Sequence, residues 1–227
     1  MKFSLSRLKF LLLFLCLSSG IITYGQHDIE VLKYKYYTSY FSTTEHIPVI
    51  IEYTLTKKMI TCKTLLKRTN KFAPDPAHQD LTDLEKDYKG SGYDRGHNMS
   101  AADNKCDITG MKECFYFSNM TPQPHSFNAG KWEETEKTER EKAMATGKVI
   151  VTTGSIGKAA TIGVDKVVVP KFMWKVIYIP SDKTYLCYFF PDTDDVHESL
   201  DTYMKTLAEI EKYANVIFEE GMVRLNP

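Results

Sequence analysis

The sequence lacks several features that would place it in a specialised class. No apolar run is long enough to cross a bilayer, because the N-terminal run FLLLFLCL falls far short of the roughly 20 residues that a spanning helix needs. There is no internal repeat and no low-complexity tract. There is also no CxxC pair and the histidines are scattered, which disfavours a zinc site. Neither charge sign is in excess, with 29 basic and 29 acidic residues.

Residues 1–25 have the layout of a secretory signal peptide. Three cations precede the apolar run, and small or polar residues lead to Gly25-Gln26, where we expect cleavage. Lipidation at Cys16 is the less favoured alternative, because the bulky Leu15 stands where a small residue is expected. We therefore expect the mature chain to be secreted or periplasmic, without a membrane anchor.

Removal of this leader takes away three cations and no carboxylate, which leaves 26 basic against 29 acidic residues. The mature chain is thus mildly acidic, and attraction to a polyanion would require a local basic patch. Residues 26–227 are long enough for one domain with a full hydrophobic core.

Four cysteines follow the leader, and an even count in an exported chain favours disulfides over free thiols. Three pairings can be drawn. The short interval from Cys106 to Cys114 favours a local bridge, which leaves Cys62 with Cys187.

The residue patterns predict an α+β domain with an antiparallel central sheet flanked by helices. Within residues 48–67, PVIIEYTL and MITCKTLLK are predicted as a strand pair because they are rich in β-branched residues. A helical turn at LTDLEKDY follows. The further strand candidates are CFYFSNM, KVIVTTG, KVVVP, FMWKVIYIP and TYLCYFF.

Two longer helices are predicted. The polar segment from Asn128 to Thr146 is nearly free of glycine and proline, which indicates a surface helix with one working face. Near the C-terminus, apolar residues recur at helical spacing behind the capping candidates Asp194 and Asp195. These apolar residues are Val196, Leu200, Tyr203, Leu207 and Ile210.

One face of the first helix carries residue types with chemical potential. Positions four apart lie on the same side of a helix, so Asn128, Glu136 and Arg140 share a stripe with Trp132. We interpret Trp132 as a core residue. The charged positions beside the stripe are interpreted as solvated surface, and they are Glu133, Glu134, Lys137 and Glu139.

If the segment carrying His97 packs across that stripe, four kinds of group converge. A neutral histidine takes a proton from water near neutral pH. An amide oxygen suits Mg²⁺, and a carboxylate can hold the waters of the metal. Arginines bind phosphate oxygens and offset developing charge. Phosphodiester hydrolysis is the reaction that uses all of these roles together.

The ordered motifs DYKGSGYDRGH, AAD, SNMTPQ and FNAGKWEETE closely resemble those of the secreted DNA/RNA non-specific endonucleases, a ββα-metal (His-Me finger) nuclease family. The stretch VVVPKFMWKVI also resembles this family, so the similarity runs from about Tyr53 to the C-terminal helix. The resemblance implies a ββα-metal active-site motif and a metal-dependent endonuclease that hydrolyses phosphodiester bonds of both DNA and RNA.

Carried over to this sequence, the resemblance implies that His97 of DRGH is the general base that activates water. Asn128 of FNAGKW would be the single direct ligand of Mg²⁺, for which Mn²⁺ is a candidate substitute. Glu136 would bind the metal through water.

The resemblance also implies supporting roles. Arg95 and Arg140 would contact the phosphate, and Arg68 would take the place of an upstream substrate-binding arginine. Asn119 of SNMTPQ would support the site through hydrogen bonds. One departure stands beside the histidine: the family continues DRGH with a hydrophobic residue and then a proline, whereas Asn98-Met99-Ser100 follow here.

A second hypothesis keeps the same fold without the activity, as a catalytically silent exported module that binds nucleic acid or protein. The intact set of His97, Asn128 and Glu136 favours the enzyme. The sequence leaves open whether DNA or RNA is preferred, what the biological role is, and whether the chain forms a homodimer.

Overall fold

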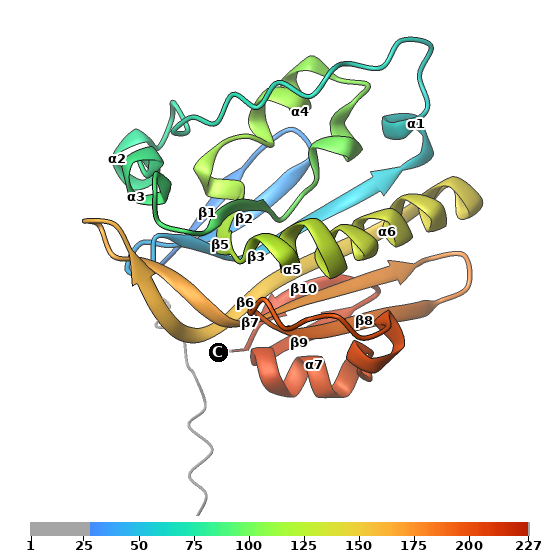
Figure 1. Cartoon of the computed structure of the whole chain (residues 1–227). Helices are drawn as coiled ribbons and strands as arrows, with labels where there is room; N and C mark the ends of the chain where they lie inside the picture. Colours follow the sequence, from blue (N-terminus) through green and yellow to red (C-terminus); the bar gives the residue numbers. More distant parts are fainter. Residues whose placement is uncertain (1–27, 227) are drawn as a thin grey trace, which may run out of the picture.

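The computed structural model describes residues 28–226, so the predicted signal peptide and its cleavage site lie outside the described residues. Its centre is a six-stranded antiparallel sheet in the order β1-β2-β3-β6-β7-β8 (Figure 1). The strands are β1 (Ile29–Lys33), β2 (Tyr37–Ser42), β3 (Ile47–Thr56), β6 (Lys148–Ile162), β7 (Val167–Ile179) and β8 (Thr184–Pro191). The predicted α+β class with an antiparallel central sheet is confirmed.

Helices cover both faces of this sheet (Figure 1). On one face lies α6 (Glu133–Thr146), and on the other lie α7 (Leu207–Ala214) and the hairpin of β9 (Val216–Glu219) and β10 (Met222–Leu225). Successive strand side chains point to opposite faces. Ile51 accordingly joins a core cluster with Trp132 and Ala143, whereas its neighbour Ile50 joins a second cluster with Ile210.

A small two-stranded sheet carries the DRGH motif above the α6 face. Its strands are β4 (Asp94–His97) and β5 (Met120–Gln123), which pair antiparallel. The remaining short elements are α1 (Lys57–Ile60), α2 (Gln79–Thr82), α3 (Glu85–Tyr88), η1 (Ala101–Asn104), α4 (Ile108–Glu113), η2 (Phe117–Asn119), α5 (His125–Phe127), η3 (Asn128–Trp132) and η4 (Leu200–Tyr203). In the described part of the chain, no helix has both the length and the apolar character needed to cross a membrane.

The predicted strand MITCKTLLK is wrong. Its first residues form α1, and the segment that follows runs as an irregular loop whose residues 61–65 are all exposed. A β-branched composition stabilises a strand only where one face packs against a neighbour, and this segment has no such face to bury.

Two other strand predictions need smaller corrections. KVVVP and FMWKVIYIP are one strand, β7, because Pro170 lies where the register with β6 shifts and the ladder tolerates its missing N–H. In CFYFSNM, the residues from Phe117 to Asn119 form a 3₁₀ turn and the strand begins only at Met120. A short buried apolar run does not distinguish a strand from a buried turn.

The predicted C-terminal helix is divided into two elements. Thr206 caps α7 in a capping box with Glu209, so Asp194 and Asp195 do not cap it. The predicted apolar stripe is also divided, because Val196 packs in the core under α6 while Ile210 packs in the core on the opposite face. The hairpin of β9 and β10 after this helix was not predicted.

The favoured disulfide pairing is wrong: the structure joins Cys62 to Cys106 and leaves Cys114 and Cys187 as buried free thiols. The reason is the packing of α1 on η1, which brings Cys62, two residues past the end of α1, beside Cys106, two residues past the end of η1. Cys187 lies instead within the sheet core on the α7 side, and Cys114 lies in a small cluster with Met111.

Candidate active site

The pairing of β4 with β5 places the DRGH motif. His97 is opposite Met120, and Gly96 is opposite Thr121. A Cβ on Gly96 would meet the side chain of Gln123 at 2.2 Å, so glycine is needed here for close packing within the small sheet.

The imidazole of His97 lies in an aromatic enclosure and is only 5% exposed. Its ring centroid is 4.9 Å from that of Phe115 and 5.6 Å from that of Phe72. One ring nitrogen donates to the backbone of Arg95, and Nε2 is buried without a hydrogen-bond partner among the described residues. Burial, followed by the charge of Arg68, lowers the pKa of His97 to about 3. The ring is therefore neutral at neutral pH and presents a free acceptor nitrogen.

Asn128 lies at a bend where the chain enters the long helix. The turn from Asn128 to Trp132 is π-helical, with Gly130 outside helical geometry at φ −110° and ψ −108°. The amide Nδ2 of Asn128 donates to Asp94 Oδ2 over 2.9 Å, and the same oxygen is 2.8 Å from His125 Nδ1. Asp94 thus orients the amide of Asn128.

Trp132 joins this helix to the strand of His97. Its indole is fully buried, as predicted, and its Nε1 donates to the backbone oxygen of His97 over 2.8 Å. The tryptophan is therefore a core residue that also sets the distance between the helix and β4.

Glu136 and Arg140 lie one turn apart on α6, as the spacing predicts, with 3.8 Å between their nearest charged atoms. Arg140 makes a closer ion pair of 3.0 Å with the fully buried Asp103. Burial, followed by the charge of Glu139, raises the pKa of Asp103 well above its usual range. Burial also raises the pKa of Glu136, which has a side-chain hydrogen bond with Ser100. Asp103 was not among the predicted site residues, although it is the aspartate of the AAD motif.

The other two predicted arginines contact aromatic rings beside His97. The guanidinium of Arg95 lies 4.1 Å from the ring centroid of Phe72 and pairs with Glu85 at 2.9 Å. The guanidinium of Arg68 lies 5.1 Å from the ring centroid of Phe115. Both cations therefore contact the two rings that enclose His97.

Asn119 holds the chain immediately after His97. Its Oδ1 accepts from the backbone of Met99 over 2.9 Å, and its Nδ2 donates to the backbone oxygens of Met99 and Cys114. All of these groups are buried. Asn119 thus fixes the backbone beside the histidine, which is the type of support expected of it.

The departure from the family motif at Asn98-Met99-Ser100 is built into the site. The amide of Asn98 donates to Thr121 Oγ1 and accepts from Thr153 Oγ1, so it bridges β5 and β6. Ser100 caps η1 by accepting from the backbone of Ala102. These residues are buried anchors for the segment between His97 and Asp103.

One prediction about the helix surface is wrong. Glu139 was expected to be solvated, but it is fully buried and pairs with the equally buried Lys175 at 3.0 Å. Tyr53 donates to its other oxygen over 2.8 Å. A single sequence does not reveal this partner, because Lys175 lies on β7 and meets α6 only after the sheet has formed.

The described residues contain no group of three or more histidine, cysteine, aspartate or glutamate side chains arranged to hold a metal. The Oδ1 atom of Asn128 remains as a hard oxygen donor, because its Nδ2 is committed to Asp94. The carboxylate of Glu136 lies on α6, beyond the bend at Gly130, so the helix predicted as continuous from Asn128 to Thr146 is interrupted there. This donor set suits a hydrated Mg²⁺ or Mn²⁺ ion, which needs few protein ligands.

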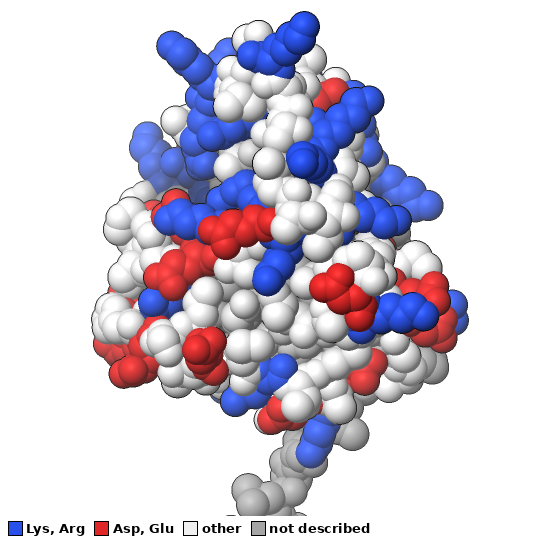
Figure 2. All heavy atoms as spheres, turned by 90° about the vertical axis from the view of Figure 1, so that its right-hand side faces the viewer, with Lys and Arg blue, Asp and Glu red and all other residues white. Residues whose placement is uncertain are grey.

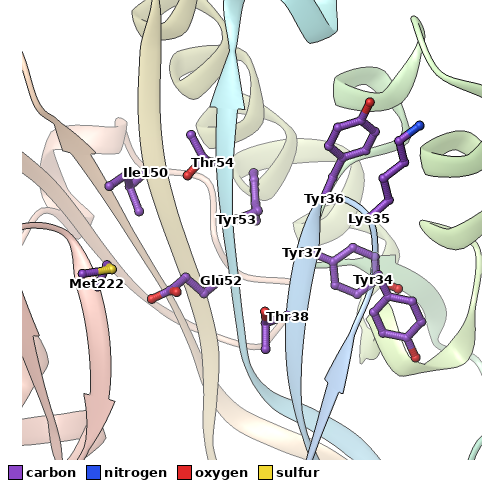
Figure 3. Close-up of a pocket in the computed structure, with 10 residues that line it drawn as sticks. All are labelled: Tyr34, Lys35, Tyr36, Tyr37, Thr38, Glu52, Tyr53, Thr54, Ile150 and Met222. Carbon is purple, nitrogen blue, oxygen red and sulfur yellow. The ribbon is translucent and has the colours of Figure 1, made fainter.

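A different hollow of about 380 Å³ lies away from these groups. Figure 3 shows that it is lined by tyrosines around the connection of β1 and β2, by Glu52 and Thr54 of β3, and by Met222 of β10. None of the predicted site residues lines it.

The structure and sequence resemble those of known nucleases. A solved structure of an EndoG/EndoGI complex superposes with a TM-score of 0.75 at 24% identity, covering 85% of this chain and 86% of that chain, which supports the fold. In sequence, the chain is 38% identical to the mitochondrial nuclease EXOG of Danio rerio over 125 residues, and 32% identical to nuclease C1 of Cunninghamella echinulata over 169 residues.

These sequence matches are partial. The match to the Danio rerio protein covers 49% of this chain and 36% of that protein, and the match to nuclease C1 covers 66% of each. The chain therefore spans little more than a third of the length of the EXOG relative. The model of the DNA/RNA non-specific endonuclease family, in contrast, matches residues 19–225. The fold, the DRGH strand and this match agree, and the chain belongs to the DNA/RNA non-specific endonuclease family.

Proposed function

We propose that this chain is a metal-dependent endonuclease that hydrolyses phosphodiester bonds in DNA and RNA with little sequence preference. The observation that carries the proposal is the buried Nε2 of His97, which has no partner among the described residues and belongs to a ring held neutral. A free imidazole nitrogen beside arginines and an oriented amide is the arrangement that general-base attack on a phosphate requires.

In this mechanism, Nε2 of His97 accepts a proton from a water molecule as that water attacks the phosphorus. The bond between phosphorus and the leaving oxygen on the opposite side breaks. The hydrogen bond from the other ring nitrogen to the Arg95 backbone keeps the tautomer in which Nε2 is the acceptor. The Phe72 and Phe115 rings keep bulk water away from the base.

Asn128 would hold Mg²⁺ directly through Oδ1, and Glu136 would bind it through a water molecule. When bound, the metal supplies positive charge to the scissile phosphate and the leaving oxygen. Asp94 keeps the amide in the orientation that presents Oδ1. The relatives are named as nucleases, and this chain's oxygen donors support Mg²⁺ with Mn²⁺ as a substitute.

Three arginines would contact the substrate phosphates. Arg68 and Arg95 lie beside the rings that enclose His97, and Arg140 lies beside Glu136 on α6. Arg95 and Arg140 are each paired with a carboxylate, Glu85 and Asp103 respectively. A phosphate would compete for Arg95, whose partner is exposed, more readily than for Arg140, whose partner is fully buried.

We propose further that residues 1–25 are a signal peptide, that residues 26–227 act as one domain, and that the mature chain is secreted or periplasmic. The cations and apolar run of the leader support export. Several relatives are named as mitochondrial, so the compartment must be measured. N-terminal sequencing of the protein recovered from medium and periplasm would test this, and an intact Met1 in the cell pellet would refute it.

Plasmid nicking tests the activity. The purified protein should nick supercoiled plasmid and digest RNA with Mg²⁺, EDTA should stop both reactions, and Mg²⁺ or Mn²⁺ should restore them. His97→Ala should lower the rate by at least 10²-fold, the range for loss of a general base. His197→Ala, at an exposed histidine, is the control.

The same assay separates the enzyme from a silent binding module. A module would retain nucleic acid in a filter-binding assay but would not nick with either metal. Equal nicking by the His97→Ala and parent proteins, with unchanged thermal melts, would refute the assignment of the base.

A further inference from the structure

A cavity of about 500 Å³ lies next to the active site, between the loop after α1 and helix α4. Its apolar wall is made of Leu66, Ala73, Ile108, Met111 and Tyr116. Ile108 is 77% exposed, which is unusual for a large aliphatic side chain beside a cavity. Ile108, with the half-buried Leu66 and Ala73, is therefore the part of the wall that a ligand could contact, whereas Met111 and Tyr116 are buried.

Cations surround this apolar wall. Lys67, Lys71 and Lys112 line the cavity, and no carboxylate is among the described residues that do so. None of these three lysines forms an ion pair with a residue that the structure describes. We call this site the lysine pocket.

The lysine pocket belongs to the most basic part of the molecule. Residues 57–74 contain six cations and no acidic residue, although the chain as a whole is balanced. Figure 2 shows lysine and arginine gathered at the top of the molecule, where Figure 1 places α4 and the loop after α1. This is a local basic patch of the kind that a mildly acidic chain needs in order to hold a polyanion.

The loop that forms one wall is fixed at three points. The disulfide from Cys62 to Cys106 ties its start to η1. The backbone N–H of Leu66 donates to Lys105, and Ala73 exchanges backbone hydrogen bonds with Phe115 and Phe117. The lysine pocket is therefore preformed, and a ligand would not have to order its walls.

The lysine pocket and the active site share neighbouring residues. Lys67 and Tyr116 line the pocket. Arg68, which follows Lys67, contacts Phe115, which precedes Tyr116, and the ring of Phe115 packs against His97. A strand of nucleic acid bound at His97 thus passes close to the pocket.

We propose that the lysine pocket receives one unpaired base of the substrate strand, while its three lysines hold the flanking phosphates. This rests on the proposed nuclease function. An apolar or aromatic wall for the base and cations for the backbone are the combination with which proteins bind single strands without sequence preference. The volume of the cavity suits a nucleotide, and its concave walls fit a single base better than a flat lipid surface.

The test measures binding without cleavage. The His97→Ala protein in EDTA is titrated into a fluorescein-labelled 12-nucleotide DNA strand, and anisotropy gives Kd at several salt concentrations. Changing Lys67, Lys71 and Lys112 together to Gln should raise Kd about tenfold or more. The slope of log Kd against log salt should fall by about 2, since each single-strand phosphate contact contributes about 0.7.

A second pair of measurements isolates the base. The His97→Ala protein should bind a strand with abasic sites about fivefold or more weakly than the intact strand, in line with the loss of one stacked base. Ile108→Asp, at an exposed position, should remove this difference between the two strands. Thermal melts of each variant confirm that it is folded.

The control changes three other lysines, Lys183, Lys205 and Lys212, to Gln, which alters the net charge equally on the β7–β8 turn and around α7. This control variant should have a Kd within about twofold of that of the His97→Ala protein.

Equal losses of affinity in both triple variants, or no effect of abasic sites, would overturn the proposed base-binding role of the lysine pocket while leaving the nuclease proposal intact. Binding of phosphatidylglycerol vesicles through the three lysines, with oligonucleotide binding unchanged, would identify a lipid site instead. Absence of any nucleic-acid binding, together with no nicking by the parent, would overturn both proposals.

Discussion

At the scale of single residues, environment decides what each side chain can do. His97 is an ordinary histidine by sequence, but its burial between Phe72 and Phe115 and the charge of Arg68 keep it neutral. Asp94 is likewise defined by its partners, since it orients Asn128 and also contacts His125. The motif supplies these groups, and the neighbouring side chains set their protonation and direction.

The pKa of His97 predicts a specific pH dependence of stability. Its folded-state pKa of about 3 is below the ordinary value of 6.5. Between these values, the unfolded chain binds a proton that the folded chain does not, so stability falls as the pH falls below 6.5. From pH 7 to pH 4.5, His97 should cost about 2–3 kcal/mol, at about 1.4 kcal/mol for each pH unit below 6.5.

Urea unfolding of the parent and of His97→Gln, at both pH values in EDTA, measures this effect. The parent should lose about 2–3 kcal/mol more than the variant on acidification. The same substitution at His197 controls for general effects of the change. Identical losses in all three proteins would show that His97 titrates normally.

At the scale of elements, α6 is attached to the sheet through a buried ionic contact. Lys175 of β7 pairs with Glu139 of α6, Tyr53 of β3 donates to the same carboxylate, and the ammonium lies 4.6 Å from a ring of Trp132. Trp132 in turn donates to the backbone of His97. The network thus connects the sheet, the helix and strand β4.

Removal of one member should destabilise the fold. Lys175→Met leaves the carboxylate of Glu139 buried without its cation, so the free energy of unfolding should fall by about 3–5 kcal/mol. Adding Glu139→Gln should recover a large part of that loss, because the unpaired charge is removed. Chemical denaturation of the single and double variants measures both values.

Lys137→Met provides the matched control on the same helix. Lys137 pairs with Glu133 at the surface, where both side chains are about half exposed, and its loss should cost about 0.5 kcal/mol or less. An equally small loss for Lys175→Met would contradict the structural role assigned to the buried pair.

At the scale of the whole molecule, one covalent link stabilises the part that carries the lysine pocket. The disulfide from Cys62 to Cys106 closes a loop over 44 residues and joins the basic loop after α1 to η1. The chain between these cysteines includes His97 and both arginines of the β4 side, Arg68 and Arg95.

Loss of this link should lower stability without abolishing the fold. Cys62→Ser with Cys106→Ser should cost about 2–4 kcal/mol, the usual range for a loop of this length. The control variant changes the free thiols Cys114 and Cys187 to alanine and keeps the bridge. A reducing agent should lower the melting temperature of this variant as much as that of the parent, because only the bridge is reduced. A parent protein whose melting temperature is insensitive to reductant would contradict the pairing.

The sequence alone predicted much of the architecture and the family. Antiparallel strands follow from alternating β-branched runs, and the proximity of Glu136 to Arg140 follows from helical spacing, since both depend on local periodicity. The single helix predicted from Asn128 was wrong, because the chain leaves helical geometry at Gly130. The strand predicted at residues 59–67 was wrong because composition cannot show that a segment lacks a face to bury. The predicted disulfides were wrong because chain spacing does not measure distance in the fold.

What the sequence by itself determined is therefore the family, the class of fold and the set of groups available for chemistry, because motifs and periodicity are local properties of the chain. Only the tertiary structure decided which groups meet. Asp94 with Asn128, Arg140 with Asp103, and Lys175 with Glu139 are separated by 34 to 37 residues. Packing of the sheet, helix and loops brings such residues together, and burial then sets the protonation of His97.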